Sequence, residues 1–189
     1  MHELQTPRRV RPLSDVPIPN ADEIAIDTSP APRRARMLGL GIALVFTVLD
    51  QVVKTAVEHV LVPGEFVPWL SRHIGWQLVY NPHGAFGVPA PPWLFLAVTV
   101  VVGVIVFQSL PRVPNRWQAV AFGLLLAGAM GNAIDRVFRA GAPGGGFGGG
   151  HVVDFVAWGT FPRFNVADAA ITVGFICLAV SLWVDERRS

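Results

Sequence analysis

Four long apolar segments constrain the fold of this 189-residue chain more than any other feature. Each approaches the roughly 20 residues that an α-helix needs to cross the hydrocarbon core of a membrane. Apolar residues make up 52% of the chain and charged residues only 15%, which favours a membrane protein over a soluble protein with oily core helices. The sequence therefore predicts four transmembrane helices, at about Met37–Val57, Trp93–Leu110, Trp117–Ile134 and Val166–Val184.

The first 36 residues differ in kind from the four spans. They contain six prolines, six arginines and five acidic residues, and they lack the apolar core of a cleavable signal peptide. We expect a disordered cytoplasmic tail over 1–36, a transmembrane domain over 37–184 and a cytoplasmic C-terminus over 185–189. The formal charge of +2 is too small to indicate nucleic acid, and Cys177, the single cysteine, excludes an internal disulfide.

Arginines flank the predicted spans mainly on one side. The positive-inside rule assigns that side to the cytoplasm, so both termini are expected inside and the segments Glu58–Pro92 and Arg136–Asn165 outside. Seven arginines follow the rule: Arg33, Arg34, Arg36, Arg112, Arg116, Arg187 and Arg188. Four arginines in the outer segments keep the bias moderate: Arg72, Arg136, Arg139 and Arg163.

Polar residues within the spans gather near the predicted outer face. Asp50 and Lys54 lie four residues apart in the first span, hence on one helix face and within pairing distance. Lys54 is the only lysine in the chain, and its compact ammonium group suits a tight site better than an arginine fork. The alternative is a lysine that extends to the membrane surface, but this does not explain an aspartate placed deeper in the span.

An Asn-x-x-Asp pattern occurs twice, in GNAIDR at Gly131–Arg136 and in FNVADA at Phe164–Ala169. Three-residue spacing places the amide and the carboxylate on one helical face, so each asparagine can orient or contact what its aspartate serves. Asn165 is also well placed as the N-cap of the fourth helix, and both roles stay open.

Three aspartates near the outer face are candidates for catalysis: Asp135, Asp154 and Asp168. The chain has no Gly-x-Ser-x-Gly serine and no His-Glu-x-x-His pair, and we expect neither a metal nor a cofactor. Acid–base chemistry by two carboxylates that share a water remains. Asp168 begins a helix, whose dipole favours its charged form, whereas the apolar run HVVDFVAW raises the expected pKa of Asp154. Arg136 and Arg139 beside Asp135 favour an ion-paired brace.

These motifs together resemble lipoprotein signal peptidase (signal peptidase II), a family of bacterial membrane aspartyl proteases. The resemblance covers about Met37–Val184 in the family's order, through DQVVK, NPHGAFG, GNAIDR, VVDF and FNVADAAI. Each motif is short, but five in order around four spans are highly specific. His83 stands where the family usually has glycine. The glycine-rich connection Arg139–His151 is longer than the family norm, and we favour an inert insertion over a role at the entrance.

The resemblance implies an all-α membrane protein: four transmembrane helices with a small extracytoplasmic β-cradle and a short periplasmic helix over the entrance. WQLVYN, Trp76–Asn81, is typical of a short strand near that cradle. The implied catalytic pair is Asp154 and Asp168. We assign Asp168 to activate water and Asp154 to protonate the leaving amine, and the reverse assignment stays open because the two carboxyl groups are coupled. The residues implied to line or brace the site are Asp50, Lys54, Asn81, Asn132, Asp135, Arg136 and Asn165.

The implied reaction removes the signal peptide from a diacylglyceryl-modified prolipoprotein by cleavage before the lipid-modified cysteine. The implied partners are this substrate and membrane lipids, without nucleic acid. We expect a monomer in the bacterial cytoplasmic membrane with its site near the outer face. A small transporter or proton-relay protein is an alternative, but it predicts polar residues throughout the membrane depth. A purely structural four-helix subunit leaves the repeated Asn-x-x-Asp pattern without a purpose.

Overall fold

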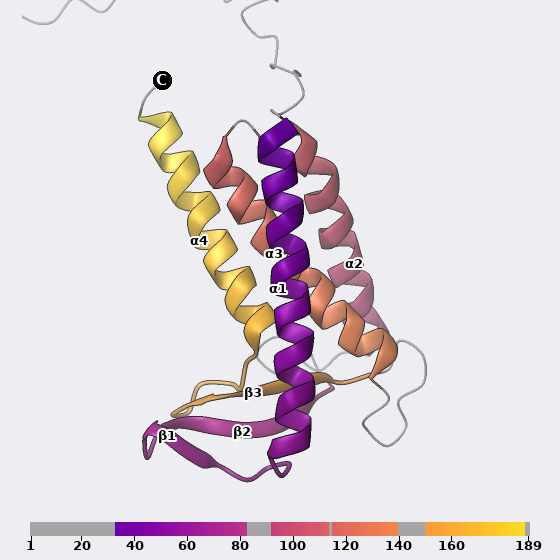
Figure 1. Cartoon of the computed structure of the whole chain (residues 1–189), viewed down its shortest axis with the longest axis vertical. Helices are drawn as coiled ribbons and strands as arrows, with labels where there is room; N and C mark the ends of the chain where they lie inside the picture. Colours follow the sequence, from indigo (N-terminus) through magenta and orange to yellow (C-terminus); the bar gives the residue numbers. More distant parts are fainter. Residues whose placement is uncertain (1–32, 83–91, 114, 140–149, 188–189) are drawn as a thin grey trace, which may run out of the picture.

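Four long helices form the body of the molecule in the computed structural model, which describes residues 33–82, 92–113, 115–139 and 150–187 (Figure 1). Each helix is long and apolar enough to cross a membrane, which confirms the four predicted spans. The first helix begins at Arg33, four residues before the predicted Met37, and the rest of the expected tail lies outside the described residues. The helices are α1 (Arg33–Val60), α2 (Pro92–Ser109), α3 (Arg116–Phe138) and α4 (Val166–Glu186).

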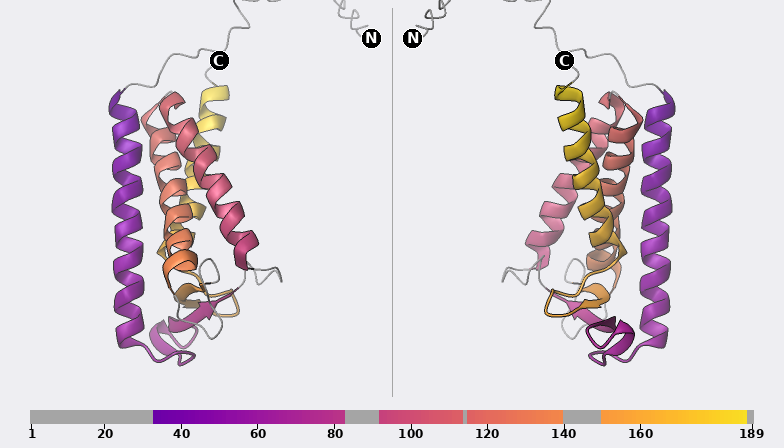
Figure 2. Two further views of the ribbon diagram at one scale, coloured as in Figure 1. Left: turned by 90° about the vertical axis from the view of Figure 1, so that its right-hand side faces the viewer. Right: turned by 90° about the vertical axis from the view of Figure 1, so that its left-hand side faces the viewer.

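The central helix is α3, which packs against the other three and lies between α1 and α2 (Figure 2). In the apolar 18-residue stretch of α3, 67% of the residues are buried, whereas only 11% are buried in the corresponding stretch of α2. Small residues permit the close approach. A Cβ added to Gly123 would lie 2.5 Å from the carbonyl oxygen of Gly39 on α1, and one added to Gly128 would lie 2.4 Å from that of Ala167 on α4. Such residues let helix backbones meet in lipid, where apolar side chains gain little by leaving the acyl chains.

A three-stranded antiparallel sheet closes one end of the helix bundle (Figure 1). Its strands are β1 (Val67–Ser71), β2 (Ile74–Asn81) and β3 (Val152–Trp158), in the order β1-β2-β3. The predicted strand at Trp76–Asn81 is therefore confirmed as part of β2.

The short helix expected over the entrance is not found at the sheet end of the described chain. The one short helix within the described ranges is η3 (Leu110–Arg112), which joins α2 to α3 at the opposite end of the bundle. His83 and most of the glycine-rich connection lie in 83–91 and 140–149, outside the described residues.

The sequence of β3 determines which way its aspartate points. Val153 and Phe155 are buried and pack with Val53 and Val57 of α1. Because side chains alternate along a strand, Asp154 projects from the opposite face of the sheet. Val153 and Phe155 thereby hold β3 against α1, and the carboxyl group of Asp154 is directed away from that helix.

Candidate active site

Asn165 and Asp168 form the start of α4. The Oδ1 atom of Asn165 accepts the backbone N–H of Asp168 at 2.9 Å, and Oδ2 of Asp168 accepts the backbone N–H of Asn165 at 3.2 Å. This reciprocal capping box satisfies two amides that a helix start leaves without partners, and it confirms Asn165 as the N-cap. The carboxylate of Asp168 is thereby fixed in the first turn of the helix.

Asp154 lies beside this helix start and is 2% exposed. Its Oδ1 accepts a hydrogen bond from Nδ2 of Asn165 at 2.7 Å, and its Oδ2 accepts one from Nδ2 of Asn81 at 3.0 Å. Burial, and then the negative charge of Asp168, raise the pKa of Asp154 to about 7. The two asparagine amides and Lys54 oppose this rise. Asp154 therefore exchanges its proton near neutral pH.

A single amide, that of Asn132 on α3, joins the helix start to the interior of the bundle. Its Nδ2 donates to Oδ1 of Asp168 at 2.9 Å. Its Oδ1 accepts from Nδ2 of Asn165 and from Nζ of Lys54, each at 3.2 Å. With both atoms engaged, the amide has one satisfied orientation, and this orientation presents its N–H group to the carboxylate.

The chain's single lysine is completely buried at 0% exposure. The Nζ atom of Lys54 lies 2.8 Å from Oδ2 of Asp50 and 2.7 Å from Oδ2 of Asp135, and it also donates to Asn132. The predicted Asp50–Lys54 pair is confirmed, and the alternative of a lysine that reaches the membrane surface is wrong. All three ammonium protons have acceptors, which is the condition for a stable buried charge.

The two aspartates that bind Lys54 each hold one neighbour of the candidate catalytic pair. Oδ1 of Asp50 accepts the backbone N–H of Ala167 at 2.9 Å, beside Asp168 on α4. Oδ2 of Asp135 accepts the backbone N–H of Val153 at 3.2 Å, beside Asp154 on β3. Lys54 thus lies at the centre of a brace that sets the two backbones relative to each other.

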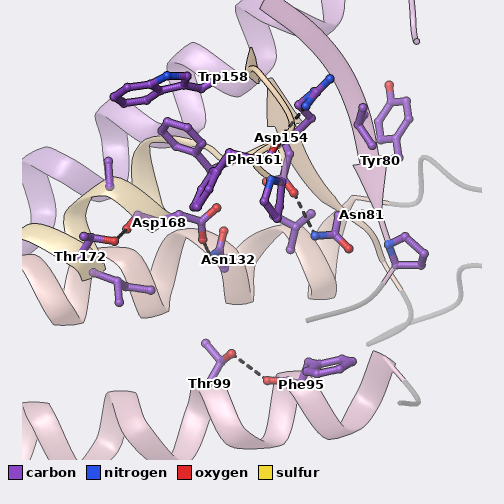
Figure 3. Close-up of a pocket in the computed structure, with 18 of the residues that line it drawn as sticks. Tyr80, Asn81, Phe95, Thr99, Asn132, Asp154, Trp158, Phe161, Asp168 and Thr172 are labelled. Carbon is purple, nitrogen blue, oxygen red and sulfur yellow. Dashed lines mark hydrogen bonds between the residues drawn. The ribbon is translucent and has the colours of Figure 1, made fainter. Parts of the chain in front are cut away.

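A cavity of about 1690 Å³ opens in front of the two aspartates. Figure 3 shows Asp154, Asp168 and Asn132 on one side and Phe95 and Thr99 of α2 on the other. The guanidinium of Arg136 also lines the cavity; its Nη1 donates to the carbonyl of Asn132. The rest of the wall is mainly apolar, with Val98, Trp158, Phe161, Ile171 and Val173 among its residues. The arrangement offers an acid–base pair at the edge of a large apolar space.

A family model described as signal peptidase (SPase) II matches residues 42–184. The chain belongs to the signal peptidase II family. A lipoprotein signal peptidase from Mycobacterium leprae is 41% identical over 150 residues, covering 79% of this chain and 72% of the relative. One from Pseudomonas putida is 34% identical over 169 residues, covering 83% of this chain and 93% of the relative.

The fold is shared with solved structures of membrane enzymes. A bacterial membrane enzyme determined by the in meso method at 2.3 Å resolution superposes with a TM-score of 0.71 at 26% identity. The match covers 85% of this chain and 94% of that one. This signal peptidase II family member is therefore a multi-pass bacterial membrane protein with a fold shared by enzymes of that environment.

The structure connects all nine predicted site residues of this family member in one network. They come from α1, β2, α3, β3 and α4, which are far apart in the sequence. Among the described residues, no group of three His, Cys, Asp or Glu side chains is arranged to hold a metal ion. The connected residues are Asp50, Lys54, Asn81, Asn132, Asp135, Arg136, Asp154, Asn165 and Asp168.

Sequence reasoning found only part of an outer layer of this network. Nε of Arg139 lies 2.8 Å from Oδ1 of Asp135, and Nη1 of Arg139 pairs with Glu58 at the end of α1. Gln51 donates to Oδ1 of Asp135 at 3.0 Å. The ion-paired brace expected of Asp135 and Arg139 is confirmed. Nothing in the spacing of Gln51 or Glu58 pointed across to α3.

Proposed function

We propose that this chain is an aspartyl endopeptidase that removes the signal peptide from diacylglyceryl-modified prolipoproteins, cutting before the lipid-modified cysteine. One observation carries the proposal: the side-chain amide of Asn165 binds the carboxyl group of Asp154 and the backbone N–H of Asp168, and both aspartates line the large cavity. Two carboxyl groups held in different environments are the means by which aspartic proteases divide the roles of acid and base. Family membership supports the same activity.

Asp168 is the base in this mechanism. Its carboxylate accepts hydrogen bonds from Asn132 and from the backbone of Asn165, and it lies at a helix start, where negative charge is favoured. From there it takes a proton from the attacking water. Asp154, with a pKa of about 7, polarises the scissile carbonyl and then protonates the leaving amine.

The remaining donors at the cavity bind the substrate. The amide of Asn81 and the guanidinium of Arg136 line the cavity, where they hold the peptide backbone or the oxyanion of the tetrahedral intermediate. The apolar wall formed by α2 and α4 accommodates the acyl chains and the apolar signal peptide. At about 1690 Å³ the space exceeds the roughly 300–1,000 Å³ of small-molecule pockets, which suits a lipidated peptide.

The sheet end of the molecule is proposed to face outward, with both termini in the cytoplasm and the protein a monomer. Arg33, Arg112, Arg116 and Arg187 lie at the opposite end of the helices, as the positive-inside rule requires of the cytoplasmic side. A topology reporter inserted at Gly146 is expected to report outside, and one at Pro114 inside. If the two reporters gave the reverse result, the sheet end would face the cytoplasm, which would contradict the proposed topology.

The activity is tested with purified protein and two forms of one prolipoprotein, with and without diacylglycerol on its cysteine. We expect cleavage of the modified form, with mass spectrometry locating the new N-terminus at that cysteine. Faster cleavage of the unmodified form, or a cut elsewhere, would contradict the proposed substrate class.

A further inference from the structure

Two arginines at the sheet end are not part of the polar network. Arg136 and Arg139 bind Asn132 and Asp135 within it, whereas Arg72 and Arg163 lie near the turn between β1 and β2. The positive-inside rule disfavours basic residues at the end of the molecule proposed to face outward. A local anionic partner would explain why these two arginines stand at this end of the molecule.

Arg72 and Arg163 share a small hollow of about 260 Å³. Nη1 of Arg163 donates to the carbonyl of Phe161 at 2.9 Å, and its Nε donates to Oε1 of Gln77 at 2.7 Å, so its guanidinium is fixed in place. Nε of Arg72 donates to Nε2 of His73 at 3.1 Å. None of the described residues that line this hollow carries a carboxylate. We call it the basic hollow, and it consists of Phe66, Arg72, His73, Gly159, Thr160 and Arg163.

The neighbours of the basic hollow are those expected at the depth of lipid headgroups. Arg163 precedes by three residues the start of α4 at Val166, where the apolar span begins. Trp158 and Phe161, next to the hollow, are 62% and 51% exposed, and Trp69 on β1 is 63% exposed. Exposed tryptophans at the end of a span are typical of the membrane interface. Figure 1 shows the β1–β2 turn at the sheet end, extending sideways beyond the first turn of α4.

We propose that the basic hollow binds the phosphate of an anionic phospholipid headgroup in the leaflet at the sheet end. The fixed guanidinium of Arg163 and the second guanidinium of Arg72, with no carboxylate among the described residues that line the hollow, are the chemistry that recognises such a phosphate. A volume of 260 Å³ is several times the roughly 30 Å³ that one water occupies, so a headgroup phosphate fits. The exposed aromatic rings beside the hollow lie among the glycerol and upper acyl segments of the same lipid.

The bound lipid has a second consequence, which rests on the proposed peptidase activity. Gly159, Thr160 and Arg163 line both the basic hollow and the large cavity, so they form a wall between the two. A headgroup that bridges Arg72 and Arg163 fixes this wall from outside. Anionic lipid is therefore expected to lower the KM of the peptidase reaction and to leave kcat nearly unchanged.

The binding test uses the full chain in phosphatidylcholine vesicles and measures the association of spin-labelled phosphatidylglycerol relative to spin-labelled phosphatidylcholine. The wild-type protein is expected to prefer phosphatidylglycerol. Arg72→Gln and Arg163→Gln are each expected to reduce this preference about fivefold, the effect of one arginine at an anionic surface. Arg163→Lys keeps the charge and is expected to retain most of it. Arg116→Gln is the matched control, because it removes one arginine beside an exposed tryptophan at the other end.

Several outcomes would overturn the proposal. Wild-type association without a preference for phosphatidylglycerol is one, and an equal loss in Arg116→Gln is another. Displacement of the lipid by millimolar inorganic phosphate would mean a free-anion site instead. If Arg72→Gln leaves lipid association unchanged but raises the KM for a prolipoprotein with acidic residues after its cysteine, the partner is the substrate. Absence of cleavage in every protein, with the lipid preference intact, would contradict the proposed function alone.

Discussion

The side chain of Asn165 holds Asp154 through a 2.7 Å hydrogen bond from Nδ2 to Oδ1, while its own Oδ1 caps α4 at the backbone N–H of Asp168. One side chain therefore combines helix capping with the placement of a carboxyl group. The two functions can be separated, because serine is as good an N-cap as asparagine but has no amide to reach the carboxyl group.

Asn165→Ser is expected to lower kcat/KM about 10- to 100-fold, the range for loss of one hydrogen bond to a charged group. Its thermal stability should stay close to that of the wild type, since the cap is kept. Asn165→Ala loses both the cap and the hydrogen bond to Asp154. Its free energy of unfolding should fall by about 1 kcal/mol, so it should unfold at a lower temperature. Equal activity of Asn165→Ser and the wild type would show that the amide does not position Asp154.

The pH dependence of cleavage reports on Asp154. Burial and Asp168 raise the pKa of Asp154 to about 7, so its acid form is lost as pH rises through that value. We expect kcat/KM to fall on the alkaline side with an apparent pKa near 7. The same sign applies to stability: a raised carboxyl pKa favours the folded state at low pH, and this contribution is lost as pH rises through about 7.

Removal of Asn81 should move this alkaline limb. The hydrogen bond from Asn81 lowers the pKa of Asp154, so Asn81→Ala is expected to raise the pKa and shift the limb to higher pH. Gln118→Ala removes a buried amide at the other end of α3, where it contacts Asp185, and should leave the limb in place. A shift to lower pH in Asn81→Ala would contradict the assigned proton donor.

Lys54 is expected to dominate the stability of the polar network. Lys54→Met leaves Asp50 and Asp135 buried without their shared cation, which costs about 3–5 kcal/mol when one partner of a buried pair is removed. Thermal unfolding in detergent measures this loss. Adding Asp50→Asn should recover part of it, because Arg139 still pairs with Asp135. Arg34→Met, at the exposed start of the same helix, is the control, and an equal effect there would refute the buried brace.

The crossing of α3 and α4 gives a steric prediction. A Cβ on Gly128 would lie 2.4 Å from the carbonyl oxygen of Ala167, next to Asp168, so Gly128→Ala must displace the start of α4. We expect reduced activity together with a lower unfolding temperature. Gly41→Ala is the matched control, since its Cβ meets no atom within 4 Å and alanine is the better helix former. Similar behaviour of the two variants would show that the helices are not tightly packed at Gly128.

Patterns within single elements were predictable from the sequence. Apolar length predicted the four spans, the strand-like segment WQLVYN predicted the strand at Trp76–Asn81, and four-residue spacing predicted the Asp50–Lys54 pair, because each depends on local sequence alone. The N-cap role of Asn165 belongs to the same class. The expected short helix at the entrance came from resemblance rather than from residues, and the described part of the sheet end does not contain one.

Contacts between elements were not predictable in the same way. Lys54 reaches Asn132 across 78 residues of sequence, and Asp50 reaches the backbone of Ala167 across 117. Such distances depend on how closely α3 approaches α1 and α4, and glycines at the crossings set that approach. A spacing rule covers one helix and cannot supply the partner on another. The bracing of Asp135 was expected, but its link to the backbone of β3 required the packed structure.

The most direct test of the catalytic pair compares three substitutions of the same kind, Asp154→Asn, Asp168→Asn and Asp135→Asn, in cleavage of a diacylated prolipoprotein by purified protein. Each replaces a carboxyl group in one connected network, but only the first two lie on the cavity. We expect Asp154→Asn and Asp168→Asn to stay folded and to lose at least about 100-fold in kcat. The folded fraction of Asp135→Asn should still cleave. Near-normal turnover by Asp154→Asn, with Asp135→Asn inactive although folded, would contradict the assignment.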